Sequence, residues 1–318
     1  MRTRSLLQPR AGAVLALVDP AQRGDIEGVH DFRVAARSLR AALRTLTHRA
    51  DAPLVEHTKG SLRIALRTLA DVRDRDVGRS LIAKVKSGVA IDPALKRRIL
   101  GLSDSDRRVA LTRSETRWPK ELDRQLITLL RRGEASVDTV IRRTRAEAWQ
   151  QRRRAIDILN ILGRRYSPVR LHELRRRVRA IRYALEVLAE VDSGANSRVI
   201  VLKPLQSALG DAQDNIVLSR WLASQAARFR RRDPVLSNAL RQQAVHFHAQ
   251  SVRAHASFLT LKPRAILERL ALHVDPHSES PPPASGRRPR RPPSIPRTRT
   301  GRSDRRAAPR ARTGSARS

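Results

Sequence analysis

The sequence contains no cysteine. Disulfide bonds and cysteine-based metal or nucleophile sites are therefore excluded. Aromatic residues make up only 3% of the 318 residues, whereas hydrophobic residues of all kinds make up 40%. Leu, Val, Ile and Ala must then form most of the core, and such residues suit packed helices.

The chain also lacks a run of about 18 apolar residues, the length that a membrane-spanning helix needs. The apolar segment Ala11–Val18 follows basic residues, as in a signal peptide, but it is short and is followed at once by Asp19 and Pro20. It has no clear small-residue cleavage site, so we interpret it as part of a first helix. The sequence predicts a cytoplasmic protein with no membrane span.

Acidic residues are scarce as well. Lys and Arg together number 66 against 30 Asp and Glu, which leaves a formal net charge of +36. Such an excess does not stabilise a folded domain, because like charges repel. Nucleic acid, an acidic membrane or inorganic polyphosphate could each neutralise it. A GC-rich genome would explain the preference for Arg over Lys, but not the excess of basic over acidic residues.

A helical period runs through most of the chain. Proline stands near several expected helix starts, as at Pro53, Pro168 and Pro234. After one short helix within residues 1–27, the period predicts helices over residues 29–48, 54–70, 74–87, 94–117, 120–131, 136–162, 168–191, 197–210, 213–231, 235–260 and 263–272. The predicted fold class is all-α.

Residues 277–318 differ in composition from the rest of the chain. They are rich in Pro, Arg and Ser and almost free of large apolar side chains, which predicts a disordered tail. The tail holds 12 Arg against Glu279 and Asp304, so its net charge is +10 and the rest of the chain keeps +26. The tail therefore does not account for the basic excess.

Two segments of the chain repeat one pattern, and Val29–Leu43 aligns with Leu171–Leu185 without a gap. We define the first row as His30, Arg33, Arg37, Arg40 and Arg44, and the second row as His172, Arg175, Arg179 and Arg182. At about 100° per residue, each row falls within an arc of about 80° on a helix. The opposite side is apolar and carries Phe32, Leu39, Leu43 and Leu46 in the first segment and Leu174, Ile181, Leu185 and Leu188 in the second.

A second pattern repeats further along in the same order. Its matched positions are Leu69 with Leu209, Asp71 with Asp211, Asp74 with Asp214, Val77 with Val217 and, upstream, Leu62-Arg63 with Leu202-Lys203. Two repeated patterns in one order predict two helical bundles related by pseudo-twofold symmetry, over about residues 8–133 and 134–272. This symmetry would bring the two rows to one cleft.

The rows have two interpretations. A solvated helix face is the common explanation of an arginine run, but such a face usually mixes charges of both signs. Here no acid interrupts the basic positions until Glu186. A bound anion relieves repulsion between cations one turn apart, and the guanidinium fork fits phosphate oxygens. The pattern favours an anion site, in which the neighbouring cations disfavour protonation of His30 and His172.

At these residues the chain resembles the CHAD family, named for conserved histidines in an alpha-helical domain. The first family pattern, V-H-x-x-R-V-x-x-R-R-L-R, is matched by Val29, His30, Arg33, Val34, Arg37, Leu39 and Arg40. The second, H-x-L-R-x-x-x-K-R-L-R-Y-x-L-E, is matched by His172, Leu174, Arg175, Arg179, Arg182, Tyr183, Leu185 and Glu186. A third, L-G-x-x-x-D-x-x-V, is matched by Leu209, Gly210, Asp214 and Val217, and the resemblance covers about residues 8–272.

The resemblance implies two helical bundles around a basic channel that binds inorganic polyphosphate, and many members go to polyphosphate granules. Polyphosphate contacts are accordingly expected from His30, Arg33, Arg37, Arg40, Arg44, Arg63, His172, Arg175, Arg179, Arg182 and Lys203. Ser38 and Ala180 stand where the family often has a basic residue, which predicts weaker affinity. The Glu-x-Glu-x-Lys signature of the triphosphatase domain in some relatives is missing, so that activity is not transferred.

Catalytic and metal sites fit the sequence less well. It has no P-loop, His-Glu-x-x-His or nucleophile-elbow pattern. The acid pairs Asp71/Asp74 and Asp211/Asp214 could bind Mg²⁺, but acids near helix starts more often cap helices or pair with Arg. No acid completes a metal site with the histidines of the last long helix, which are His246, His248 and His255. We predict no enzyme activity, metal or cofactor.

Nucleic-acid binding is the main alternative function. The basic tail could bind DNA or RNA through counterion release. Single-strand binders usually supply aromatic platforms, whereas Trp118, Trp149 and Trp221 are scattered and are interpreted as core residues. A phosphate chain has no bases to contact, so a lining of Arg and His suits it better. Both modes could coexist, with the tail adding non-specific attraction.

Overall fold

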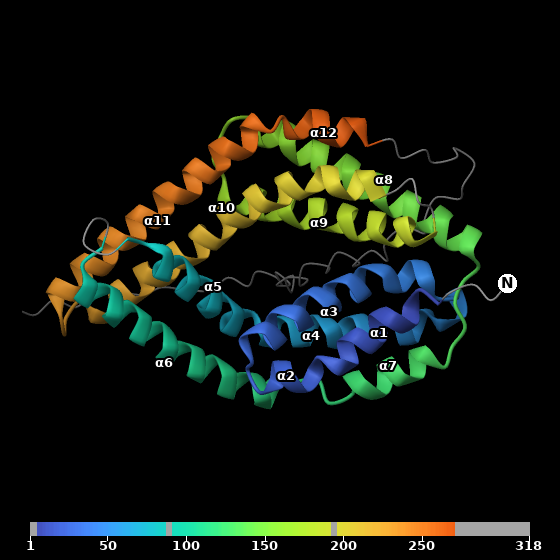
Figure 1. The fold of residues 1–318 in the computed structure, drawn as a ribbon, viewed down its shortest axis with the longest axis horizontal. Coiled ribbons are helices and arrows are strands. Elements are labelled where there is room, and N and C mark those ends of the chain that lie inside the picture. The colour runs from blue at the N-terminus through green and yellow to red at the C-terminus, as the bar shows by residue number, and fades with distance from the viewer. Residues whose placement is uncertain (1–4, 87–90, 192–195, 271–318) are drawn as a thin grey trace, which may run out of the picture. The chain divides into compact units, whose positions relative to one another are not determined.

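Helices form the architecture of the computed structural model, which describes residues 5–86, 91–191 and 196–270 (Figure 1). The helices in these ranges are α1 (Leu7–Ala16), α2 (Val18–Gln22), α3 (Ile26–Leu46), α4 (Ala52–Thr68), α5 (Ala70–Lys84), α6 (Pro93–Arg117), α7 (Leu122–Leu130), α8 (Val137–Leu162), α9 (Pro168–Val191), α10 (Asn196–Phe229), α11 (Pro234–Thr260) and α12 (Pro263–Arg269). A short 3-10 helix (Arg49–Asp51) and an isolated β-bridge between Thr47 and Glu134 complete them. The predicted all-α fold class is confirmed.

Capping residues explain where several helices begin. The side chain of Asp25 accepts a hydrogen bond from the backbone N–H of Gly28 at the start of α3, and Asp92 does the same for Leu95 at the start of α6. These oxygens satisfy backbone donors that the first helical turn leaves unpaired. Proline occupies the first turn of α4, α6 and α11, where its missing N–H costs nothing.

The prediction of two helices over residues 197–210 and 213–231 is wrong, because α10 is one helix of 34 residues. Gly210 costs a helix about 1 kcal/mol relative to Ala. Leu205 and Leu209 are buried on one side of Gly210, and Ala212 and Ile216 on the other. Each buried Leu or Ile contributes about 1.5–3 kcal/mol, which outweighs the glycine. Residues 1–27 also hold two helices, α1 and α2, where one was predicted.

The apolar sides of the two repeated helices lie in separate cores. Phe32, Leu39 and Leu43 of α3 belong to a cluster with α1, α2, α4 and α7. Leu174, Ile181 and Leu185 of α9 belong to another with α8, α10 and α12. All six side chains have no solvent exposure. The predicted apolar face of each helix is confirmed.

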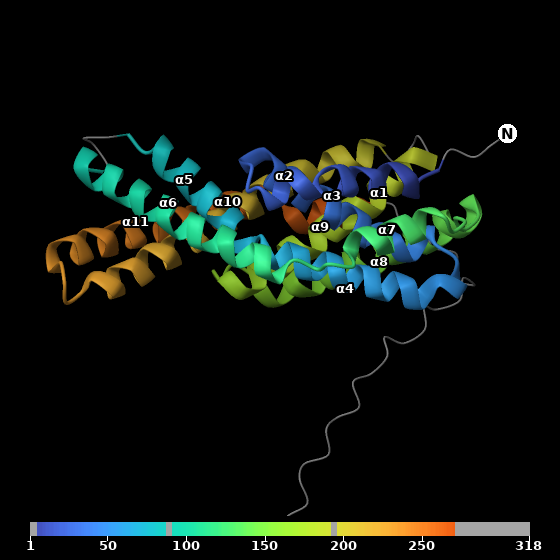
Figure 2. The same ribbon diagram turned by 90° about the horizontal axis from the view of Figure 1, so that it is seen from below.

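Contacts repeat in the two parts of the chain. In the first part α3 packs against α1, α2 and α4, and in the second part α9 packs against α8 and α10. The repeated sequence patterns make α4 and α5 together the counterpart of α10. The two parts meet where α3 contacts α9 and α5 contacts α10 (Figures 1 and 2). A third apolar cluster joins α5 and α6 to α10 and α11, so the described helices form one unit.

Three other expectations concern a membrane span, the C-terminal tail and the division into two halves. None of the helices in the described ranges is long and apolar enough to cross a membrane. The predicted tail, residues 277–318, lies outside the described residues. The predicted division of the helices near residues 133 and 134 stays a prediction.

Candidate polyanion-binding site

Arginines of the two rows come together where α3 contacts α9. Burial and the nearby cations Arg33 and Arg175 together lower the pKa of Arg37 to about 10. Burial also lowers the pKa of Arg179 to about 9, with added repulsion from Arg175 and Arg37. Both causes disfavour the charged guanidinium. Arg33 and Arg37 of α3 and Arg175 and Arg179 of α9 therefore form one cluster of cations.

Arg33 is the most buried member of the first row, with 8% of its surface exposed. Its Nη1 donates a hydrogen bond of 2.5 Å to the backbone oxygen of Leu66, in the last turn of α4. Helix C-termini attract cations because their last carbonyls lack partners. Burial lowers the pKa of Arg33 to about 10, although Asp74 opposes this effect. Arg33 thus fixes α3 against α4 and contributes charge to the cluster.

Further cations surround Arg40. Burial lowers the pKa of Arg40, and repulsion from Arg176 and Arg63 adds to the effect. Arg63 is exposed on α4, so the structure brings this predicted residue to the first row. Lys59 lies one turn before Arg63. Burial lowers the pKa of Lys59, and repulsion from Arg44 and Arg40 lowers it as well. The basic cluster is therefore wider than the two rows.

The ends of both rows carry acids. Arg44, at the end of the first row, pairs with an acid of another helix, because its Nε donates to Glu56 Oε1 of α4 at 2.8 Å. Arg182 of the second row lies 3.2 Å from Glu186 on the same helix and stacks over the ring of Tyr183. Lys203 is exposed on α10, and no hydrogen bond or ion pair of it is found in the described ranges. The cluster is centred on the middle of the rows.

The two row histidines have different neighbours. Burial lowers the pKa of His30, and Arg73 is the next cause. The predicted effect of nearby cations is confirmed for His30, although burial is larger. His172 Nδ1 lies 3.0 Å from Gln213 Oε1. Arg73 and Gln213 occupy the same position of the second repeated pattern, so one repeat places a cation where the other places an amide.

Two aspartates adjoin the cluster at matched positions of the repeat. Burial raises the pKa of Asp74, and Arg33 opposes the effect. Burial also raises the pKa of Asp214, and Arg175 opposes it there. Asp214 raises the pKa of Asp74 as well, so the two carboxyl groups lie near each other. No ion pair of Asp74 or Asp214 is found in the described ranges, so the expected pairing of these acids with Arg stays a prediction.

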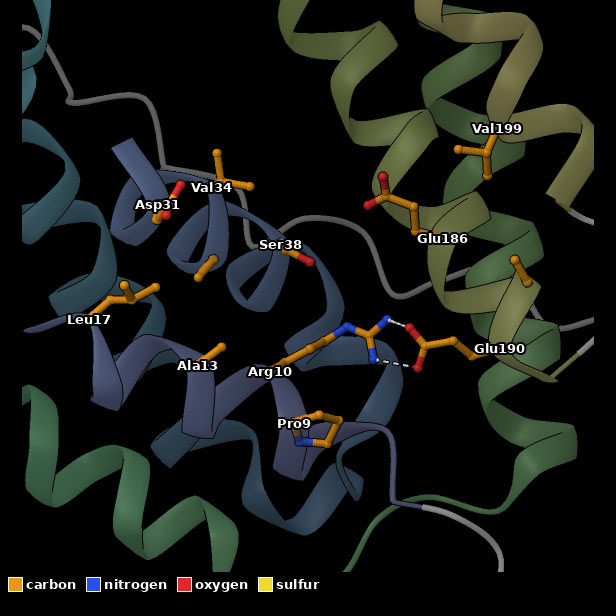
Figure 3. Close-up of a pocket in the computed structure, with 12 residues that line it drawn as sticks. Pro9, Arg10, Ala13, Leu17, Asp31, Val34, Ser38, Glu186, Glu190 and Val199 are labelled. Atoms are coloured by element: carbon orange, nitrogen blue, oxygen red, sulfur yellow. Dashed lines mark hydrogen bonds and ion pairs between the residues drawn. The ribbon is translucent and has the colours of Figure 1, made fainter. Parts of the chain in front are cut away.

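A pocket of about 730 Å³ lies beside the rows, between α1, α3, α9 and α10 (Figure 3). Its polar lining includes the acids Asp31, Glu186 and Glu190, and Arg10 Nη2 forms an ion pair of 2.5 Å with Glu190. Ser38 faces this pocket on α3. The acids make it unsuited to a polyanion. A cleft lined by both rows stays a prediction.

The remaining aromatic and histidine residues differ in burial. Trp118 packs on Phe32 with ring centroids 5.2 Å apart, and Trp221 is 8% exposed. The interpretation of Trp149 as core is wrong, since it is 39% exposed beneath Arg153. His255 is buried against the ring of Tyr166. Within the described ranges, no group of three or more His, Cys, Asp or Glu side chains could hold a metal ion.

Several site residues were missed by sequence reasoning. They are Lys59, Arg73, Arg176, Tyr183 and Gln213. Gln213 contacts a row residue, and each of the others interacts electrostatically with one. Arg73 and Gln213 stand inside the second repeated pattern, whose alignment could have identified them. Lys59 and Arg176 carry no such signal, because only the packing of α4 and α9 against α3 brings them to the cluster.

Comparisons with known proteins agree with this arrangement. Residues 5–223 match the family model described as the CHAD domain. The CHAD domain from the plant Ricinus communis has a similar solved structure, with a TM-score of 0.61 and 18% identity over 83% of this chain and 90% of that chain. PptA from Streptomyces chartreusis is similar as well, with a TM-score of 0.54 and 18% identity over 81% of this chain and 97% of that chain.

No curated protein matches the chain in sequence. At 18% identity, the two solved structures show a shared fold and no more. The match to the family model extends over residues 5–223, which is more than half of the chain and includes both rows. The chain belongs to the CHAD domain family.

Proposed function

We propose that the protein binds inorganic polyphosphate through the two rows without catalysing a reaction, and that binding localises it to polyphosphate granules. The proposal is carried by one observation, the cluster of Arg33, Arg37 and Arg179 from two repeated helices, whose pKa values fall to about 10, 10 and 9. In the described ranges, neither Arg37 nor Arg179 forms an ion pair. A bound polyanion would remove the repulsion and supply the missing acceptors.

Polyphosphate suits this cluster better than nucleic acid does. Each phosphate unit offers oxygens to a guanidinium fork, and no base needs a stacking platform. Tyr183 is the aromatic residue that opposes the lowering of the pKa of Arg37 and Arg179. Its side chain is buried, with 6% exposure. A buried ring under an arginine cannot receive a base. The membership of the chain in the CHAD family supports the same ligand.

The test replaces Arg37 and Arg179 together by Gln and measures binding of long-chain polyphosphate at about 150 mM salt. Hydrogen bonds to charged groups contribute about 1.5–3 kcal/mol each, so the double variant should bind about 100-fold more weakly. Arg164→Gln with Arg165→Gln is the matched control, because this pair is exposed in the turn between α8 and α9. The control should lose less than about threefold.

Three results would contradict the proposal. Unchanged affinity of the Arg37 and Arg179 double variant would show that the rows are not the site. Stronger binding of the wild type to DNA at equal phosphate concentration would favour the nucleic-acid alternative. Release of orthophosphate from polyphosphate during the titration would show that the protein is an enzyme.

A further inference from the structure

We propose a second phosphate-binding site at the turn between α10 and α11, which long polyphosphate chains occupy together with the rows. The inference deepens the proposed function and rests on it. Arg228, Arg230, Arg231 and Arg232 line a pocket of about 740 Å³ here, together with Ala227. All four arginines are exposed. No acidic side chain lines this pocket, in contrast to the pocket between α1, α3 and α9.

Two acids near this turn, Asp233 and Asp106, are already engaged. Asp233 Oδ1 caps α11 by accepting from Leu236 N at 2.9 Å, and its Oδ2 lies 2.9 Å from Arg98 Nη2. Asp106 Oδ2 accepts hydrogen bonds of 2.8 Å from Trp221 Nε1 and of 2.8 Å from Gln225 Nε2. Both carboxylates are therefore occupied by contacts within the fold. Apart from the contact of Asp106 with Arg228, these contacts leave the arginines of the turn without an acidic partner in the described ranges.

Packing holds one side of the turn in place. The guanidinium groups of Arg98 and Arg228 each lie 6.0 Å from the ring centroid of Phe229. Arg228 Nη1 is also 3.8 Å from Asp106 Oδ1. Arg230, Arg231 and Arg232 follow directly and form no ion pair or side-chain hydrogen bond within the described ranges. Three unpartnered guanidinium groups beside an anchored one form a site for several phosphate units.

The turn is separate from the rows. Asp214, which adjoins the row cluster, and Arg228 lie 14 residues apart on the continuous helix α10. At 1.5 Å per residue the separation is about 21 Å. A short phosphate chain can occupy one site only, whereas a long chain can occupy both. Joining two sites through one ligand raises the local concentration at the second and strengthens binding.

The test compares tripolyphosphate with long-chain polyphosphate on the full-length protein. The variant is Arg230→Glu with Arg231→Glu, and the control is Arg164→Glu with Arg165→Glu, which makes the same charge change at another exposed turn. The turn variant should bind the long chain about fivefold to tenfold more weakly and tripolyphosphate with less than twofold change. The control should leave both affinities within about twofold.

The outcomes separate this proposal from the proposed function. Equal losses in the turn variant and the control would overturn the second site, since only net charge would then matter. Equal losses for both ligands would also overturn it. A loss limited to single-stranded DNA would assign the turn to nucleic acid instead. If the wild type binds neither phosphate ligand, the proposed function itself fails.

Discussion

Each half of the repeat carries three arginines at matched positions, but the surroundings of the two sets differ. Arg33, Arg37 and Arg40 of α3 match Arg175, Arg179 and Arg182 of α9 at equal offsets. Around the first set stand further cations, among them Arg73 beside His30. Beside the second set stand Gln213 at His172 and Glu186 at Arg182, and the first row has acids as well, Glu56 at Arg44 and Asp74 near Arg33. In the proposed function the shared centre binds the polyanion, and these edge residues are expected to adjust the affinity.

The helices behind the rows also differ. In the first half the helix is interrupted at Leu69, between α4 and α5. In the second half α10 continues through the matched Leu209. Both leucines are buried, with 0% and 2% exposure. The carbonyl of Leu66 lies in the last turn before this interruption, and Arg33 donates a hydrogen bond to it. Arg33 therefore has a backbone partner at the end of a helix. The uninterrupted α10 offers its mate, Arg175, no helix end at the matched position.

Single substitutions at the centre should show the largest effect and test whether the halves act equally. Arg37→Gln and Arg179→Gln, made separately, should each weaken long-chain polyphosphate binding about tenfold, because each removes one charge-assisted hydrogen-bond donor from a half-buried position. Isothermal titration measures both. A tenfold loss in one variant with no loss in the other would contradict the equivalence of the two halves.

Alkaline pH should weaken binding next. The pKa of Arg179 is lowered to about 9 and that of Arg37 to about 10, so these groups lose their charge as the pH rises through this range. Affinity should therefore be full below about pH 8 and fall by about tenfold by pH 10.5. The variant with Arg37→Gln and Arg179→Gln should lose most of this pH dependence, and the remainder should come from Arg33, whose pKa is also lowered to about 10. A wild-type affinity that is constant from pH 8 to pH 10.5 would contradict the prediction.

The acids shared by the halves should oppose binding to a smaller extent. Asp74→Asn with Asp214→Asn removes two negative charges beside Arg33 and Arg175. The double variant should bind polyphosphate about threefold more tightly at neutral pH. Because both carboxyl pKa values are raised, the wild type should approach the variant as the pH falls and the acids take up protons. Weaker binding by the variant would mean that these acids position the arginines.

Exchange at the edge position should have the smallest effect. Gln213→Arg should strengthen polyphosphate binding about twofold by making the second half resemble the first. Arg73→Gln should weaken it by a similar factor and raise the pKa of His30, since Arg73 lowers that pKa. A proton NMR titration of His30 follows the second change. An unchanged His30 titration would show that Arg73 does not influence the row.

The sequence was sufficient for much of the fold and for the centre of the site. Apolar periodicity identified the buried faces of α3 and α9, because a side chain at one face of a helix recurs every three or four residues. The Arg44 contact with Glu56 and the approach of Arg176 to Arg40 depend on how separate helices pack, which periodicity does not encode. The continuity of α10 through Gly210 depends on the burial of Leu209 and Ala212, which local propensity also does not contain.

A crystal structure of the protein with tripolyphosphate is the most direct test of a polyanion site shared by the two halves. We predict that phosphate oxygens of one ligand lie within hydrogen-bonding distance of Arg37 on α3 and of Arg179 on α9 at the same time. A ligand bound by one half alone, or away from both rows, would contradict the account.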